Sequence, residues 1–244
     1  MKQGVFTVLE NSPLTEGFFR LRLGGDCSAI RDPGQFADLA LPGFFLRRPF
    51  SVSDWDEKSF TLVIRRTGRG TEALAALPPR AELDVLTGLG RGFDLNRAGD
   101  RPLLVGGGSG VSPLPGLARR LLALGTQPQV ILGFDSREDL MLLEDFYALG
   151  LAPTVTTRDG SFGIRGLVTE AMDLPHSFFY ACGPLPMLRA VCERSAASGQ
   201  VSLDGRMGCG FGACMGCTIP TAKGPRRVCR DGPVFDKEEM LWDL

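Results

Sequence analysis

Short runs of alternating apolar and polar residues dominate residues 1–99. The alternation has a period of two and is clearest at residues 18–23 and 59–66, while Gly and Pro break the runs. Such a period is typical of strands that bury one face, and many short strands are typical of a small barrel. We expect antiparallel strands at 5–9, 18–23, 36–41 and 59–66, and a short helix at 71–77 with Thr71 as its N-cap.

Residues 100–203 show a different pattern, in which apolar runs alternate with helix-like segments. Strands are expected at residues 101–105, 129–134, 153–157, 177–182 and 200–203, and helices at 113–124, 140–149 and 183–195. Alternating strands and helices predict a parallel sheet with right-handed crossovers. A glycine-rich turn at 106–110 joins the first strand to the first helix, as in the opening unit of a nucleotide-binding α/β domain.

Cysteine and glycine mark the last segment, residues 204–244. Four residues separate Cys209 from Cys214, two separate Cys214 from Cys217, and eleven separate Cys217 from Cys229. This is the order of plant-type [2Fe–2S] sites, and interleaved glycines permit a tight loop whose N–H groups point at sulfur. A structural zinc site and disulfides are the competing interpretations. Zinc sites usually present two C-x2-C pairs or Cys/His mixtures, and the single histidine, His176, is distant in sequence, so iron–sulfur is favoured.

Composition sets the domain organisation without changing this picture. A length of 244 residues exceeds one typical domain, and 43% hydrophobic with 23% charged residues is ordinary for a globular protein. We therefore predict a multi-domain β plus α/β fold. It comprises an antiparallel β-barrel at 1–99, a parallel-sheet α/β domain at 100–203 and a small cluster-binding segment at 204–244.

Charge and cysteine usage narrow the classes of partner and compartment. A formal net charge of −1 gives no basis for binding nucleic acid or an anionic membrane, and no apolar run approaches the roughly 20 residues that span a bilayer. Cys27, Cys182 and Cys192 lack framework spacing, which fits a reducing compartment. The N-terminus leads into strand-like sequence without the apolar core of a signal peptide, so we expect a cytoplasmic protein.

Two pieces of the barrel region carry candidate chemistry. In Arg47-Arg48-Pro49-Phe50-Ser51, a proline of fixed φ holds a guanidinium and a hydroxyl at a stiff spacing. Downstream, residues 66–71 bring glycines to a helix N-terminus, which favours an anion. Each piece alone also fits a plain structural role, with the arginine and serine at a barrel edge and the glycines in a turn.

Together, and in this order, the two motifs resemble the flavin-binding barrel of the ferredoxin reductase superfamily. The resemblance implies that Arg48 pairs with a phosphate of FAD, that a catalytic Ser51 approaches the flavin ring, and that Gly70-Thr71 holds the pyrophosphate. The other FAD-binding positions that it implies are Pro49, Phe50, Val63, Ile64 and Arg65. Phe50 departs from the family, which commonly has an aliphatic residue there.

The glycine turn at 106–110 misses the strict G-x-G-x-x-G pattern, and alone it fits a tight turn as well as a nucleotide site. A second turn, after the strand at 177–182, again opens a helix. The pair resembles the pyridine-nucleotide half of the same superfamily, whose Cys-Gly-x-x-x-Met segment flanks the nicotinamide. A catalytic Cys182 beside the hydride-transfer site is thereby implied, the alternative being a small core residue. The implied nucleotide-binding positions are Gly106, Gly107, Gly108, Gly110, Cys182, Gly183, Pro184 and Met187.

The choice between NAD and NADP depends on the end of the second strand of the α/β domain. A carboxylate there, Asp135, accepts a hydrogen bond from a ribose 2′-OH and repels a 2′-phosphate, which favours NAD. Arg137, two residues further on, would instead favour the 2′-phosphate of NADP. NAD(H) is therefore the expected co-substrate.

These sites form a set for electron transfer. Nicotinamide exchanges electrons in pairs and an iron–sulfur cluster passes them singly, so a flavin between them converts one mode to the other. His176 fits a loop position, and no Ser/His/Asp set is present for acid–base work on an organic substrate. Substrate oxidation is therefore expected on another polypeptide, with the cluster near the contact surface.

The order of the three parts, with the cysteine spacing and the residues that follow Cys229, resembles the electron-transfer subunits of B-type dihydroorotate dehydrogenases. The resemblance implies a partner subunit that carries FMN and oxidises dihydroorotate to orotate in pyrimidine biosynthesis, in a heterotetramer. Electrons would run from FMN through the cluster and FAD to NAD. Ser109, where the family often has an apolar residue, and the short gap before Cys229 depart from it.

Two other functions remain open from the sequence. The three-part chain also resembles NAD(P)H–ferredoxin reductase-type subunits that pair with glutamate-synthase-like or hydrogenase partners. A non-enzymatic redox sensor, in which the cluster controls a binding surface, is the alternative from another class. The sensor predicts no NADH-dependent reduction of bound flavin.

Overall fold

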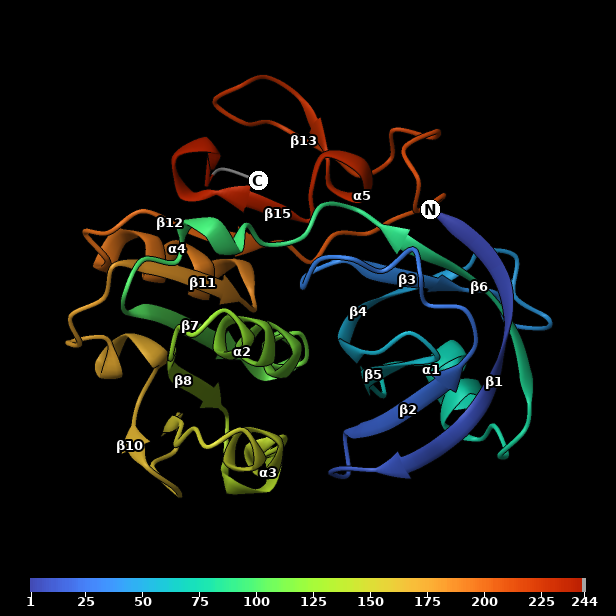
Figure 1. The fold of residues 1–244 in the computed structure, drawn as a ribbon, viewed down its shortest axis with the longest axis horizontal. Coiled ribbons are helices and arrows are strands. Elements are labelled where there is room, and N and C mark those ends of the chain that lie inside the picture. Colours follow the sequence, from blue (N-terminus) through green and yellow to red (C-terminus); the bar gives the residue numbers. More distant parts are fainter. Residues whose placement is uncertain (243–244) are drawn as a thin grey trace.

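A computed structural model describes residues 1–242, and its first part is the predicted antiparallel barrel (Figure 1). Six strands close in the order β1-β2-β5-β4-β3-β6. Their bounds are β1 (Lys2–Pro13), β2 (Phe18–Gly24), β3 (Phe36–Leu39), β4 (Arg48–Trp55), β5 (Ser59–Arg65) and β6 (Glu82–Leu89). Alternate residues of the strands, among them Leu21, Leu23 and Leu62, fill the interior without solvent exposure, as the period-two pattern requires.

The barrel differs from the sequence-based prediction at three places. Strand β6 was not predicted, and β4 had been treated only as a chemical motif. The short helix, α1 (Arg69–Ala75), begins earlier than expected, with Gly68 rather than Thr71 as its N-cap. The Thr71 hydroxyl oxygen instead accepts hydrogen bonds from the backbone N–H groups of Thr67, at 2.9 Å, and Gly68, at 3.1 Å. Thr71 therefore holds the loop that leads into the helix.

The second part is the predicted α/β domain, built on a seven-stranded sheet in the order β10-β9-β8-β7-β11-β12-β15. The strands are β7 (Pro102–Gly107), β8 (Gln129–Phe134), β9 (Thr154–Thr157), β10 (Ile164–Arg165), β11 (Phe178–Cys182), β12 (Gly199–Ser202) and β15 (Val234–Asp236). All neighbours pair in parallel except β12 and β15. Every residue of β7 and β11 is buried, because helices and loops cover both faces of a parallel sheet.

The helices of this domain are α2 (Leu114–Ala123), α3 (Leu143–Ala148) and α4 (Leu185–Arg194). Helix α3 is shorter than the predicted segment 140–149, because Leu142 adopts a left-handed conformation, with φ of 64°, that an α-helix does not continue through. Short 3₁₀ turns complete the chain at η1 (Leu95–Arg97), η2 (Gly108–Val111), η3 (Arg137–Asp139), η4 (Val168–Ala171) and η5 (Lys237–Glu239). Over residues 1–242, no helix combines the length and apolarity needed to span a membrane.

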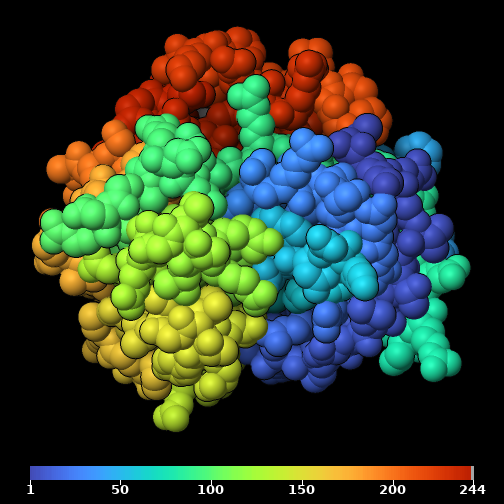
Figure 2. All heavy atoms as spheres, viewed as in Figure 1, coloured from blue at the N-terminus to red at the C-terminus, as the bar shows by residue number. Residues whose placement is uncertain are grey.

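The C-terminal segment lies across one end of both domains, in orange and red in Figures 1 and 2. It contains a two-stranded hairpin, β13 (Thr218–Ile219) with β14 (Arg226–Arg227), and a short helix, α5 (Val228–Asp231). Its last strand, β15, adds antiparallel to β12, with Val201 opposite Phe235. Because β15 completes the sheet, the segment is fixed to the α/β domain rather than appended loosely.

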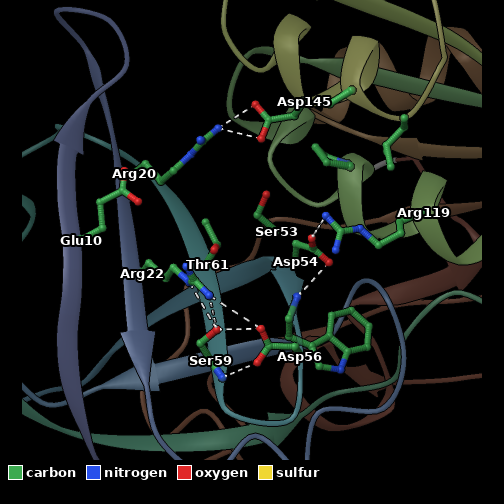
Figure 3. A pocket seen from close by; sticks show the side chains of 14 residues that line it. Glu10, Arg20, Arg22, Ser53, Asp54, Asp56, Ser59, Thr61, Arg119 and Asp145 are labelled. Carbon is green, nitrogen blue, oxygen red and sulfur yellow. Dashed lines mark hydrogen bonds and ion pairs between the residues drawn. The ribbon is translucent and has the colours of Figure 1, made fainter.

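Helix α2 joins the α/β domain to the barrel at the end of β4. A Cβ added to Gly116 would lie 2.3 Å from the backbone oxygen of Ser53, so only glycine permits this close approach. Asp54 bridges two arginines of α2, to Arg119 at 2.6 Å and to Arg120 at 3.2 Å. Figure 3 shows the adjoining hollow of 390 Å3, whose labelled arginines are turned toward carboxylates of the same lining. The pairs Arg20–Asp145 and Arg119–Asp54 therefore connect the two domains.

We expect Asp54→Asn to lower the free energy of unfolding by about 1 kcal/mol, because the partly buried guanidinium of Arg120 and the exposed one of Arg119 lose a shared carboxylate. Urea unfolding followed by circular dichroism measures the change. Asp100→Asn is the matched control, because Asp100 is 81% exposed and pairs with Arg101 only at 3.8 Å. An equal effect of both substitutions would contradict the bridging role of Asp54.

Candidate functional site

Arg48 and the Gly70-Thr71 turn, predicted separately as parts of one site, lie side by side in the structure. A Cβ added to Gly70 would stand 3.1 Å from Nε of Arg48. Arg48 donates a hydrogen bond to the backbone oxygen of Leu46, at 2.7 Å, and its guanidinium lies over the ring of Phe44, at 5.3 Å. A hollow of 470 Å3 opens here between Arg48 and the start of α1. The hollow thus combines a cation with backbone N–H groups, which suits a phosphate.

A larger cavity of 890 Å3 continues from this hollow into the space between barrel and α/β domain. Pro49, Phe50, Thr67 and Thr71 line both spaces. The predicted residues that line the cavity are Pro49, Phe50, Ser51, Val63, Ile64, Arg65, Thr71, Gly110, Cys182, Gly183 and Pro184. The fold therefore brings the two predicted halves of the site to one cavity, and its size accommodates a flavin ring against a nicotinamide.

The two predicted glycine turns meet because β7 and β11 are neighbours in the sheet, with Gly106 in register with Cys182. A Cβ on Gly110 would lie 2.1 Å from the backbone oxygen of Cys182, and one on Gly107 would lie 2.3 Å from Sδ of Met187. Gly110 is thus required for close packing between the turns because it meets backbone, whereas Gly107 contacts the end of a flexible side chain. The first turn continues as a 3₁₀ helix before α2 begins, which explains its departure from the G-x-G-x-x-G pattern.

Cys182 and Ser51, the two predicted catalytic residues, line the same cavity from opposite domains. Burial, with a smaller contribution from the charge of Asp204, raises the pKa of the Cys182 thiol to about 12. The thiol is therefore neutral near pH 7, which fits a steric or hydrogen-bonding role rather than that of a nucleophile.

Sequence reasoning missed several residues of this cavity, three of them polar residues that bear on its chemistry. Asp204 and Arg206 follow β12 and line the cavity wall. The protein around the Asp204 carboxyl shields it from part of its water and so raises its pKa. The signal was present, because ligands bind at the carboxyl ends of parallel strands. Ser112 also lines the cavity, and its buried hydroxyl has no hydrogen-bond partner among the described residues. An unpaired buried hydroxyl facing a cavity fits the presence of a bound cofactor.

Asp135 and Arg137 lie at the carboxyl end of β8, and both are exposed. The guanidinium of Arg137 is 5.9 Å from the centre of the Phe162 ring, and its backbone N–H donates to Oγ of Ser161 at 2.8 Å. Neither residue lines the 890 Å3 cavity. Their role in choosing NAD over NADP stays a prediction.

The four cysteines of the C-terminal segment form two pairs. Sγ of Cys217 is 3.2 Å from Sγ of Cys229, and both side chains are buried. Backbone N–H groups of Ala213 and Cys214 point at Sγ of Cys209, at 3.3 and 3.5 Å. The β13–β14 hairpin spans the short gap before Cys229, which explains how eleven residues suffice. Within residues 1–242, no three Cys, His, Asp or Glu side chains surround a single ion position.

The loop around these cysteines suits thiolate ligands. Burial opposes ionisation of Cys209, but hydrogen bonds from the backbone N–H groups around it lower the pKa of this thiol to about 6. N–H groups that point at sulfur are the usual outer partners of iron–sulfur clusters. Two thiol pairs match a two-iron cluster, in which each iron takes two cysteines. The residues present therefore fit a [2Fe–2S] cluster.

The cysteine segment also forms part of the cavity wall. Ile219, at the end of β13, and Val228, the neighbour of Cys229, line the same 890 Å3 cavity as Ser51 and Cys182. All three parts of the chain thus converge on one space. Electron transfer between a cluster and a flavin requires this kind of adjacency.

We expect Arg48→Ala to lower the FAD content of purified protein by about 10-fold, because one charge-assisted phosphate contact is lost. The flavin-to-protein ratio after gel filtration measures the effect. Arg31→Ala, at an exposed arginine outside both hollows, is the control. Full retention of FAD by the Arg48 variant would contradict the phosphate site.

The barrel, the parallel sheet and the cavity between them define an oxidoreductase of the ferredoxin reductase type, here with a cysteine segment against the cavity. Residues 104–193 match the family model of the oxidoreductase NAD-binding domain, and residues 204–241 match the iron-sulfur cluster binding domain of dihydroorotate dehydrogenase B. FAD, NAD(H) and a [2Fe–2S] cluster are accordingly the cofactors of this class of chain.

Curated relatives match over nearly the full length. The chain is 38% identical to the dihydroorotate dehydrogenase B (NAD(+)) electron transfer subunit of Shouchella clausii, covering 98% of each, and 41% identical to that of Bacillus caldolyticus, covering 96% of this chain and 97% of the relative. The chain belongs to the family of dihydroorotate dehydrogenase B electron transfer subunits.

Solved structures give the same fold. An NADH-dependent reduced ferredoxin-NADP oxidoreductase, described for flavin-based electron bifurcation, superposes with a TM-score of 0.89 at 27% identity, covering 98% of this chain and 91% of that one. An Amycolatopsis cytochrome P450 reductase, at 24% identity and a TM-score of 0.69, covers 79% of this chain and 65% of its own. The second likeness shows the fold alone.

Proposed function

We propose that this chain passes electrons between NAD and an FMN-containing catalytic subunit that oxidises dihydroorotate to orotate in pyrimidine biosynthesis. The curated relatives support this pathway, because they match nearly the whole chain and are named as dihydroorotate dehydrogenase B electron transfer subunits. One observation carries the proposal: the cysteine segment, the barrel and the α/β domain line a single cavity. Electrons can therefore pass between cluster and flavin within this chain.

The residues divide the work as follows. Arg48 and the Gly70-Thr71 turn would bind the FAD phosphates, with Ser51 beside the ring. The glycine turn and the Cys182–Met187 segment would orient the nicotinamide, and the four cysteines would hold the cluster. When bound, FAD exchanges electron pairs with nicotinamide and single electrons with a cluster. The chain's own residues would orient the flavin and the nicotinamide and exclude water where the two rings meet in the cavity.

Substrate oxidation is assigned to the partner. His176, the single histidine, contacts the backbone oxygen of Leu174 and Oγ of Ser195, each at 2.7 Å, and lies outside the cavity. Its ring nitrogens are thus engaged in a structural contact. The partner that we propose is the FMN subunit, in a cytoplasmic heterotetramer. The three parts at 1–99, 100–203 and 204–244 would act as its flavin, nucleotide and cluster units.

The cluster loop has the surface expected of a docking site. Cys214 is exposed, and two apolar neighbours, Phe211 at 46% and Met215 at 59%, are also exposed. Large exposed apolar side chains next to a redox group favour a protein partner over solvent. We propose that this loop faces the FMN subunit.

Reconstitution tests the proposal. The purified chain, mixed with a dihydroorotate-oxidising FMN protein from the same organism, should form a complex that reduces NAD upon addition of dihydroorotate. The FMN protein alone should not reduce NAD. Recovery of the chain from its native source with a hydrogenase or glutamate-synthase-like subunit, and not with the FMN protein, would contradict the assignment.

A second candidate is favoured by a solved relative that matches over nearly the full length, an NADH-dependent reduced ferredoxin-NADP oxidoreductase. Under this alternative the chain serves as the NAD(P)H–ferredoxin reductase-type subunit of another redox complex. Ferredoxin would then replace dihydroorotate as the electron donor in the reconstitution. A redox sensor, in contrast, would show no NADH-dependent bleaching of bound flavin.

A further inference from the structure

A buried carboxylate, Asp38, lies under the cluster loop. It is in the middle of β3, opposite Pro49 of β4 and Leu86 of β6. Its neighbours Ala37 and Leu39 fill the barrel core, so strand alternation directs Asp38 to the outside of the barrel. It is nevertheless only 2% exposed. Something outside the barrel therefore covers it.

The covering element is the loop that carries the first predicted cluster ligand. Gly210, directly after Cys209, has φ of 77°, and a Cβ added there would lie 2.4 Å from Oδ2 of Asp38. Only glycine allows this backbone path at this distance. The carboxylate of the barrel and the cluster loop are thus in direct contact.

The charge of Asp38 is poorly compensated. Its Oδ1 is buried and makes no hydrogen bond to any described residue. Two cations, Arg47 and Arg48, are close enough to act on this charge, but neither donates a hydrogen bond to the carboxylate. Arg47 donates to the carboxylate of Asp84 at 2.8 Å and to the backbone oxygen of Asp38 at 3.4 Å, and Arg48 donates to the backbone oxygen of Leu46. A buried carboxylate without full pairing costs folding free energy, and such groups concentrate at functional sites.

We propose that Asp38 lowers the reduction potential of the cluster held by Cys209, Cys214, Cys217 and Cys229 by fixing a buried negative charge against its loop. This inference rests on the proposed function of those cysteines. Reduction adds an electron to the cluster, and a nearby negative charge disfavours the added charge, more strongly where water is excluded. Because Asp38 contacts the cluster loop and does not line the flavin cavity, its charge should act mainly on the cluster and favour passage of the electron from cluster toward flavin.

Asp38→Asn tests this role with a readout other than turnover. An EPR-monitored redox titration at pH 8.5, where the carboxyl is ionised, measures the cluster potential of the purified chain. We expect the equilibrium to move about tenfold toward the reduced cluster, a rise of about 59 mV for one electron. The shift should persist at high ionic strength, because a buried charge is screened little. Asp38→Glu, which keeps the charge, should stay near the unmodified potential.

Asp56→Asn is the matched control, because Asp56 is 59% exposed in the turn between β4 and β5, and its removal should leave the potential unchanged. An unchanged potential in Asp38→Asn with full iron and sulfide content would overturn the proposal. So would failure of both Asp38→Asn and Asp38→Ser to assemble a cluster that Asp38→Glu assembles, because the carboxylate would then hold the loop rather than set the potential. Unmodified protein without iron and sulfide would contradict the proposed function itself.

Discussion

Cys214→Ser is expected to abolish electron transfer to one-electron acceptors while NADH still reduces the bound flavin. Cys214 is the exposed member of the four cysteines and accepts a hydrogen bond from the N–H of Gly216 at 3.5 Å. Removal of a group that only hydrogen-bonds to a metal ligand typically lowers metal affinity or activity by about 10–100-fold. Removal of a ligand itself should therefore lower cytochrome c reduction by more than about 100-fold. The hydride step uses the cavity residues and should change by less than about twofold.

Stopped-flow bleaching of the flavin, cytochrome c reduction and iron and sulfide analysis measure the three consequences separately. Cys192→Ser is the control, because Cys192 is a buried free cysteine in the core of the α/β domain and not at the cluster loop. Loss of both activities from the Cys214 variant, with FAD retained, would mean that the hydride step depends on the cluster.

Gly110→Ala should impair the other step, the reduction of the flavin by NADH, and leave the cluster intact. Its Cβ would collide with the backbone of β11, at 2.1 Å from the oxygen and 2.3 Å from the carbonyl carbon of Cys182. The turn and β11 would have to separate, and displacement of reacting groups by about 1 Å can cost 10²-fold. We expect NADH-dependent flavin reduction to slow by about 100-fold, while FAD and iron content stay unchanged because other segments bind them.

Gly125→Asn is the control for a glycine change in this domain. Gly125 follows α2 with φ of 79°, which asparagine tolerates, and nothing lies within 4 Å of its added Cβ. Chemical reduction of the flavin in the Gly110 variant should remain complete. A Gly110→Ala protein with a normal rate of reduction by NADH would show that contact between the two turns does not set the nicotinamide geometry.

Features encoded by local patterns were predicted well from the sequence. The barrel and the parallel sheet follow from the two periods of apolar residues, and the strand at 129–134 matches β8 at both ends. Strand β6 was not predicted although its apolar positions are buried, and the helix at 140–149 was placed without the left-handed Leu142. Tertiary contacts decide the backbone conformation of a single residue such as Leu142, and helix propensity contains no information about these contacts.

The candidate site likewise contains residues that local sequence patterns reveal and residues that only the folded structure brings together. Cysteine spacing identifies the cluster segment because the ligands lie close together in sequence. The cover of Asp38 by Gly210 and the place of Val228 in the cavity wall join segments far apart in the chain, so no local pattern reports them. Asp204 was also missed, but it could have been predicted, because a residue just beyond the carboxyl end of a parallel strand is a recognisable ligand position.

Anaerobic titration of the purified chain with NADH, followed by visible absorption and EPR, tests the central claim most directly. The account predicts a protein with about one FAD, about two irons and acid-labile sulfide per chain, in which NADH bleaches the flavin and then produces the EPR signal of a reduced [2Fe–2S] cluster. Stoichiometric zinc without sulfide, or a flavin that NADH does not bleach, would contradict it.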